Sequence, residues 1–321
     1  MVLRYKNISM KKLVLIISIL LSINVLTAQS RIYADLEPFT VVDIKFVGDV
    51  VIKQCAISNE VNIKANDYKF IENTHVVVSD GKLSIYMDKS SSREKKDKIQ
   101  MEIHLPRLEK LTLLGAGDVM VEKRDEPNLT VINAGAGECT LQCLKIEGSL
   151  ELHNKGAGDI KVSSPDPIRQ QTLLINNSGA GGVYILGSHV SNSLIVNNMG
   201  AGDVSVNLMS IPTDELILQN KSVGDIIIQN VLAKRLELRI LSTGNLKMMN
   251  GKAEEMTLES VGVGNVHLLL KVANAHITHG GVGNIIATVT GTAYLTEKSG
   301  LGKVTIHGGG EILMARAWIR Q

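Results

Sequence analysis

The sequence predicts an all-β fold: a right-handed parallel β-helix (a solenoid) of about ten rungs, each of roughly 20 residues. The first observation behind this prediction is the string Gly-Ala-Gly-Asp-Val at Gly115–Val119, which recurs with substitutions along the chain. Its copies begin, at intervals of 19 to 23 residues, at Gly115, Gly135, Gly156, Gly179, Gly200, Ser222, Ser242, Gly262, Gly281 and Gly300. A constant period of this length is typical of solenoids, in which every copy is one turn of the coil. Right-handed coiling is expected because crossovers between parallel strands are nearly always right-handed.

The second observation is the alternation of apolar residues on both sides of each copy, as in Leu194–Val206. A period of two indicates strands, so each rung is expected to hold two short strands joined by a bend. The two glycines of the bend are expected to provide positive φ angles. The inward positions should then stack into aliphatic columns, for example Val131, Leu152 and Ile175 before the bend and Val119, Ile160 and Val183 after it.

Two polar columns accompany the apolar ones. Asparagines two residues before the bend predict an amide ladder that stabilises the turn: Asn133, Asn154, Asn177, Asn198 and Asn220. The acidic column occupies the fourth position of the repeat: Asp118, Glu138, Asp159, Gly182, Asp203, Asp225, Asn245, Asn265, Asn284 and Lys303. Like charges about 5 Å apart repel, so this column should face solvent. It is interpreted as turn chemistry, with side chains bound to nearby backbone amides. The alternative is a cation site, with Ca²⁺ as the candidate ion, bridging Asp118, Glu138 and Asp159.

The ends of the rod divide the chain into segments. Lys11 and Lys12 precede an apolar run that ends near Thr27-Ala28, which is typical of a signal peptide whose start is either Met1 or Met10. The remainder is predicted to be one β-helix domain. The expected division is 1–28 signal peptide, 29–106 N-terminal cap and irregular strands, 107–307 regular repeats and 308–321 C-terminal cap.

The composition limits the classes of partner. The hydrophobic fraction is 44% while aromatic residues make up 3%, so the core must be aliphatic and stacking platforms are scarce. The formal net charge is +2 and no basic stripe with aromatic residues occurs, so nucleic acid is not an expected partner. The mature chain has no second long apolar run, so no transmembrane segment is expected.

The cysteines are expected to be packing residues. Cys139 takes a place held by Val or Ile in other copies, which favours a buried thiol, and a bridge between Cys139 and Cys143 is the alternative.

One surface feature points to a partner. Leu174, Ile195 and Ile217, here called the apolar stripe, are expected to point outward on three successive rungs. Stacked apolar side chains on a surface are usually covered. The cover is either the segment Ser163–Gln170 of the same chain or a partner, including a second copy of the chain.

The order of the motifs adds a family resemblance. The stretch Phe39–Gln54, the stretch Ile103–Val119 and the repeated Gly-Ala-Gly-Asp-Val together resemble the "putative auto-transporter adhesin, head GIN domain" family over about residues 37 to 310. The resemblance implies a right-handed parallel β-helix and an exported protein in the periplasm, on the cell surface or secreted. It brings no catalytic residues.

The sequence therefore predicts an exported, non-enzymatic binding module or envelope scaffold, with a protein or glycan surface as its partner. The alternative is a carbohydrate-active β-helix, a polysaccharide lyase or glycosidase, that uses the acidic column. No Arg or Lys recurs beside that column in the sequence, which weighs against the enzyme.

Overall fold

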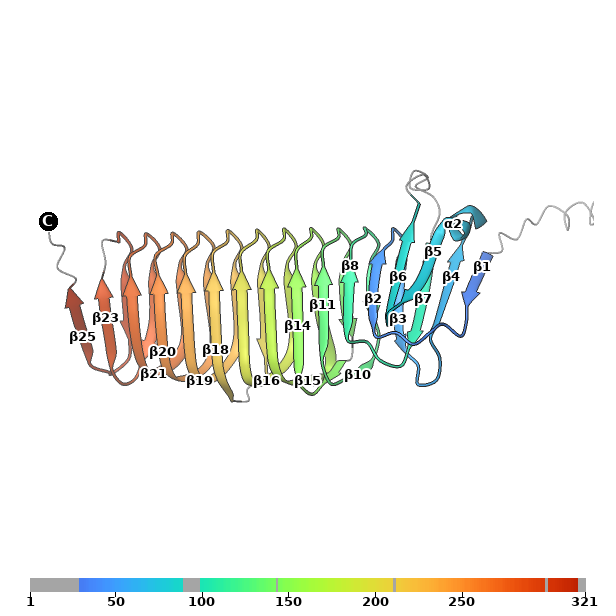
Figure 1. The fold of residues 1–321 in the computed structure, drawn as a ribbon. Coiled ribbons are helices and arrows are strands. Elements are labelled where there is room, and N and C mark those ends of the chain that lie inside the picture. The colour runs from blue at the N-terminus through green and yellow to red at the C-terminus, as the bar shows by residue number, and fades with distance from the viewer. Residues whose placement is uncertain (1–28, 89–98, 143, 210–211, 298–299, 317–321) are drawn as a thin grey trace, which may run out of the picture.

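The computed structural model describes residues 29–88, 99–142, 144–209, 212–297 and 300–316. They form an elongated rod of stacked coils, with the N-terminal section at one end and β25 at the other (Figure 1). The predicted signal peptide and Cys143 lie outside the described residues. No helix in the described part of the chain is long and apolar enough to cross a membrane.

The N-terminal section mixes parallel and antiparallel pairing. Its elements are β1 (Gln29–Tyr33), β2 (Val41–Lys45), β3 (Asp49–Gln54), β4 (Glu60–Ala65), α2 (Tyr68–Glu72), β5 (Thr74–Ser79), β6 (Lys82–Met87) and β7 (Ile99–Leu105). The β5–β6 hairpin turns at Asp80 and Gly81, both with positive φ, as a two-residue hairpin turn requires. Strands β1, β4 and β7 pair antiparallel, whereas β2 and β3 already run parallel to the repeats.

The repeats form the rod itself. Their strands are β8 (Lys110–Leu113), β9 (Val119–Val121), β10 (Arg124–Glu126), β11 (Leu129–Asn133), β12 (Cys139–Gln142), β13 (Leu144–Ile146), β14 (Ser149–Asn154), β15 (Ile160–Asn177), β16 (Val183–Asn198), β17 (Val204–Leu208), β18 (Thr213–Asn220), β19 (Ile226–Ile240), β20 (Leu246–Ser260), β21 (Val266–His279), β22 (Ile285–Val289), β23 (Ala293–Glu297), β24 (Val304–His307) and β25 (Ile312–Arg316). The predicted parallel β-solenoid of about ten turns is confirmed.

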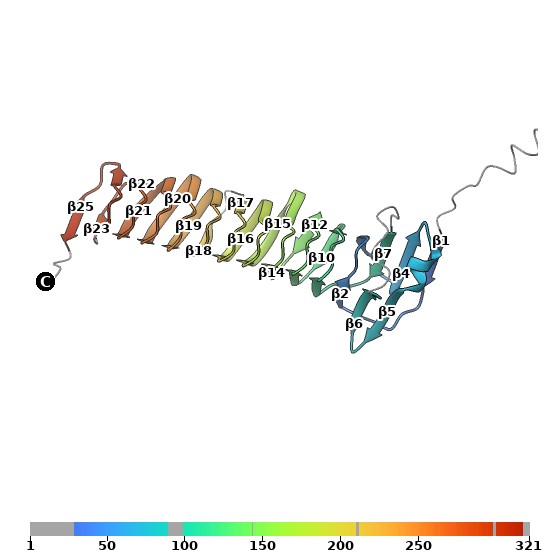
Figure 2. The same cartoon turned by 90° about the horizontal axis from the view of Figure 1, so that it is seen from above.

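Two parallel ladders make the walls. One joins the strand segments before the bends, from β2 through β8, β11 and β14 to β25. The other joins the segments after the bends, from β3 through β9 and β12 to β24. Within each ladder equivalent residues of successive rungs lie side by side (Figures 1 and 2), and the register shifts fall between the two ladders, for example between Ser163 and Thr172. The first ladder continues into the predicted C-terminal cap, because Ile312–Arg316 pairs in parallel with β23.

The core is a set of aliphatic columns between the walls. Val131, Leu152 and Ile175 of one wall and Val119, Ile160 and Val183 of the other are at most 2% exposed, as the alternation predicted. Cys139 belongs to these columns as a fully buried free thiol. Replacing one such residue with Ala removes its contacts with both neighbouring rungs. The free energy of unfolding is then expected to fall by about 2–5 kcal/mol.

The glycines of the bends have a different role from the predicted one. None of them has a left-handed φ, so the expectation of positive φ at the bends is wrong. In the repeats, positive φ occurs at the opposite corner, for example at Gly187 (78°), Asn230 (58°) and Asn250 (58°). At the bends the rungs approach so closely that a Cβ on Gly156 would lie 2.0 Å from the carbonyl oxygen of Gly135. Glycine is required there because the rungs pack closely along the rod axis, and not because the backbone needs a positive φ angle.

Candidate functional site

The acidic column lies at the outer surface, where the second wall begins. Its carboxylates accept hydrogen bonds from the backbone of the next rung: Glu138 N donates to Asp118 Oδ1, Gly182 N to Asp159 Oδ1 and Asp225 N to Asp203 Oδ1, each at 2.8 Å. The same bond recurs in the later rungs. Asn245 N donates to Asp225 Oδ1, Asn265 N to Asn245 Oδ1, Asn284 N to Asn265 Oδ1 and Lys303 N to Asn284 Oδ1. The interpretation as turn chemistry is confirmed, and the bonded amide is that of the neighbouring rung.

Lys161 neutralises part of this column. Its ammonium donates to Glu138 Oε2 and lies 3.9 Å from Asp159 Oδ2. The bond from Lys161, together with one from Thr140 Oγ1, holds the pKa of Glu138 below its usual range. Lys161 is thus a single basic partner of the column beside Glu138 and Asp159.

Tyr184 explains why Gly182 interrupts the column. A Cβ on Gly182 would lie 2.5 Å from the Tyr184 hydroxyl oxygen, so the phenol ring occupies the space of the missing side chain. Burial first, then the charges of Asp159 and Asp203, raise the pKa of Tyr184.

The structure does not gather the predicted cation ligands. Asp118, Glu138 and Asp159 lie on three successive rungs, and each binds the separate partners described above. Among the described residues, no group of three or more His, Cys, Asp or Glu side chains is placed to hold a metal ion.

The asparagine column faces the interior and closes the bends from inside. Asn133, Asn154, Asn177, Asn198 and Asn220 are all 0% exposed. Asn198 Nδ2 donates to Gly202 O at 3.1 Å within its own rung, and Asn177 Nδ2 donates to the same oxygen at 3.0 Å from the preceding rung. The predicted amide ladder is confirmed. In later rungs Ile240, Ser260 and His279 take its place.

The apolar stripe lies on the first wall. Leu174 on β15, Ile195 on β16 and Ile217 on β18 are direct cross-strand neighbours, and each is half-buried. The segment Ser163–Gln170, the predicted intrachain cover, is part of β15: its residues Ile168–Gln170 pair with β16 in the wall. No described segment crosses this wall in the view of Figure 1.

Polar residues border the apolar stripe on both sides. Asn176, Asn197 and Gln219 form the column nearer the bends, and Asn197 Nδ2 donates to Asn176 Oδ1 at 2.8 Å. Thr172, Ser193 and Glu215 form the other column. The result is a flat surface with an aliphatic centre and a hydrogen-bonding rim, the composition common at protein–protein contacts.

A second surface, the bend edge, was not singled out from the sequence. It has two rows of side chains with glycine backbone between them. The tip row is the middle residue of each bend: Ala116, Ala136, Ala157, Ala180, Ala201, Val223, Thr243, Val263, Val282 and Leu301. The shoulder row consists of the residues that precede the first eight bends: Leu114, Ala134, Lys155, Ser178, Met199, Lys221, Leu241 and Val261. The signal that could have revealed this surface is the change in the tip row from alanine to larger apolar residues.

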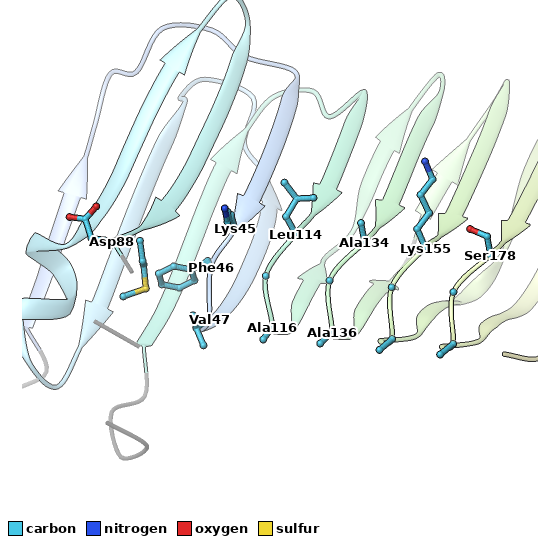
Figure 3. Close-up of a pocket in the computed structure, with 17 residues that line it drawn as sticks. Lys45, Phe46, Val47, Asp88, Leu114, Ala116, Ala134, Ala136, Lys155 and Ser178 are labelled. Atoms are coloured by element: carbon cyan, nitrogen blue, oxygen red, sulfur yellow. The ribbon is translucent and has the colours of Figure 1, made fainter. Parts of the chain in front are cut away.

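The alanine half of the bend edge is a trough of about 860 Å³ (Figure 3). Small tip residues form one side, Leu114, Lys155 and Ser178 stand on the other, and glycines form the floor. The end nearest the N-terminal section is closed by Phe46, Val47 and Met87. The trough is therefore open and straight, and its mostly apolar lining also includes Lys45, Asp88 and Lys155.

A buried ion pair was also missed. Arg124 and Glu126 on β10 are 1% and 0% exposed, and they occupy the positions that Leu144 and Ile146 take in the next rung. Their charged run Lys123–Glu126 resembled an exposed turn in sequence, and only the register shows that two of its members point inward.

Three comparisons with known proteins were made: with solved structures, with curated proteins and with family models. Solved structures that align with this chain include a putative adhesin from Bacteroides fragilis (18% identity, TM-score 0.47, covering 90% of this chain and 97% of that one). A second is a putative adhesin from Parabacteroides merdae (11% identity, TM-score 0.42, covering 90% of this chain and 96% of that one). A third is a putative lipid binding protein from Parabacteroides distasonis (13% identity, TM-score 0.37, covering 90% of this chain and 96% of that one). No curated protein matches the chain.

A family model matches nearly all of the described rod. The model described as "putative auto-transporter adhesin, head GIN domain" covers residues 38–209 and, in a second match, 197–310. The chain therefore belongs to this adhesin-like family of β-solenoid proteins.

Proposed function

We propose that the chain is an exported, non-enzymatic binding module that holds a protein partner on the flat wall around the apolar stripe. The observation that carries this proposal is the set of three aliphatic side chains in register on a wall that no described segment crosses. Burying aliphatic surface is worth about 25 cal/mol per Å², so covering this wall would be favourable. Membership of an adhesin-like family supports binding as the activity.

A protein surface fits this wall better than a glycan. The centre is aliphatic, and glycan sites usually present aromatic rings for stacking, which this wall lacks at Leu174, Ile195 and Ile217. The amide column beside it can hydrogen-bond to a partner's polar rim.

The carbohydrate-active alternative has less support. A general acid in a glycosidase needs a raised pKa, whereas the pKa of Glu138 is lowered by Lys161 and Thr140. Asp118 and Asp159 already accept backbone hydrogen bonds.

The test is a binding assay with residues 29–321 on envelope fragments of the producing organism and, in parallel, on a glycan array. Ile195→Lys places a charge at the centre of the apolar stripe and is expected to weaken binding at least tenfold. The matched control is Ile227→Lys, since Ile227 is also half-buried and outward-facing but lies on the other wall. Protease treatment of the fragments should abolish binding. Equal binding by both variants, or binding only to glycans, would contradict the proposal.

A further inference from the structure

The bend edge carries a second exposed apolar surface, apart from the apolar stripe. Four residues of its C-terminal half are strongly exposed: Val223 (66%), Val263 (55%), Val282 (53%) and Leu301 (88%). Met199, Leu241 and Val261 of the shoulder row adjoin them, with 52%, 38% and 43% exposure. A row of exposed aliphatic residues, interrupted by Thr243, is typical of a contact with another molecule.

We propose that two copies of this chain associate antiparallel through their bend edges, with the large half of each tip row packed into the alanine half of the other. The tip row has ten residues, of which the first five are alanine and the last five are Val, Thr, Val, Val and Leu. A two-fold axis between Ala201 and Val223 places every alanine opposite a larger residue of the second copy. The repeat is the same in both copies, so the match persists along the edge.

The alternative parallel arrangement lacks this match. A two-fold axis along the rod would place the shoulder residue of each rung opposite the tip residue of the same rung. Ala134 would then face Ala136, leaving a gap, and Val261 would face Val263, crowding the other end. Unfilled space and overpacking are both unfavourable, so the side-chain sizes of the tip row favour the antiparallel dimer.

The end of the row provides an independent fit. Leu301, the most exposed residue of the edge, would lie opposite Ala116 of the second copy. Ala116 lines the closed end of the trough, beside Phe46, Val47 and Met87. The most exposed aliphatic side chain of the tip row thus meets the end of the trough that Phe46, Val47 and Met87 line. Lys155 and Lys221 stand in the shoulder row, where their ammonium groups can extend to water.

The area is sufficient for a specific dimer. Ten rungs at about 4.8 Å give an edge roughly 45 Å long. With two rows of side chains the contact buries on the order of 1,000 Å² in total, at the lower limit of specific interfaces.

The first experiment measures the mass of residues 29–321 in solution by light scattering over a series of increasing chain concentrations, in which a dimer is expected to form. Val263→Lys should give a monomer, while Leu269→Lys, at a site of equal exposure (54%) off the edge, should remain a dimer. Ala157→Leu should weaken the dimer at least tenfold, because residue 157 faces Val263 of the second copy, and Ala157→Leu with Val263→Ala should restore it. Circular dichroism confirms that each variant is folded.

The second experiment determines the orientation, with Cys55 and Cys143 replaced by Ser. Chains carrying Ala116→Cys and chains carrying Leu301→Cys are mixed and treated with a short bis-maleimide. The antiparallel dimer predicts a link between the two variants and none when either is treated alone. A monomeric wild type, a dimer that survives Val263→Lys, or Ala116→Cys chains linked to each other would overturn the proposal. None of these results bears on the apolar stripe, so this proposal and the proposed function fail separately.

Discussion

Arg124 donates from Nε and from Nη2 to a single oxygen of Glu126, at 2.9 and 2.8 Å, and both side chains are fully buried. The same oxygen accepts from Leu108 N at 2.8 Å, and Arg124 Nη2 also donates to Leu105 O at 3.4 Å. Burial lowers the pKa of Arg124, and the bonds to Glu126 oppose that shift. The pair therefore connects β10 of the first regular turn to the segment that follows β7.

The first prediction concerns this pair. Glu126→Ala leaves a buried guanidinium without its counter-ion and is expected to destabilise the junction by about 3–5 kcal/mol. The double variant Arg124→Leu/Glu126→Ile introduces the residues of the next rung and should recover most of the loss. Urea unfolding followed by circular dichroism measures both. Equal losses in the single and double variants would show that the charges themselves are needed.

The second prediction concerns the bend glycines. Gly156→Ala places a Cβ 2.0 Å from Gly135 O, so the rungs must separate, and the expected loss is at least about 2 kcal/mol. Gly309→Ala is the control, because a Cβ there meets nothing within 4 Å. Thermal unfolding of the two variants compares them, and a neutral Gly156→Ala would refute the axial-packing explanation.

The third prediction concerns the interior amides. Asn198→Ala removes a buried donor to Gly202 O and should destabilise the rod by about 1–3 kcal/mol. Asn198→Ile should cost less, because Ile240 fills the equivalent position two rungs later. The unfolding midpoints of the two variants are compared, and a lower midpoint for Asn198→Ile than for Asn198→Ala would contradict the prediction.

The fourth prediction is a pH dependence. The folded-state pKa of Glu138 is lowered, so its contribution is present above the unfolded pKa and is lost as pH falls through the folded pKa. Glu138→Gln should therefore lose less stability than the wild type between about pH 5 and pH 3. Lys161→Met removes the main cause and should show the same flatter profile. Parallel profiles for all three proteins in thermal melts would contradict this assignment.

The fifth prediction concerns thiol reactivity. Burial raises the pKa of Cys139 to about 12, whereas hydrogen bonds from Ser58 and nearby backbone lower that of Cys55. Iodoacetamide should modify native Cys55 at least about 1,000-fold faster than Cys139. Peptide mass spectrometry distinguishes the two sites, and unfolding in urea should bring the rates together. Rapid native labelling of Cys139 would mean that the rung around it opens.

Much of the rod could be predicted because its determinants are local. The alternation of residues such as Leu194 and Val196 assigns inward and outward faces, and the recurring bend sets the register between rungs. The amide ladder and the turn chemistry of Asp203 followed from the same register. Arg124 and Glu126 escaped prediction because nothing in a charged run shows that its members turn inward.

The period, the strand and bend positions and the core columns could be predicted from spacing alone, because they depend on residues close together in one chain segment. The stacking of the rungs was needed to show why Gly156 must be glycine, which backbone amide Asp118 binds and how Lys161 reaches Glu138. It also brought the tip row together as one surface, from Ala116 to Leu301. The physical reason is that these contacts run along the rod axis, between residues about 20 positions apart whose distance is set by the stacking of whole rungs.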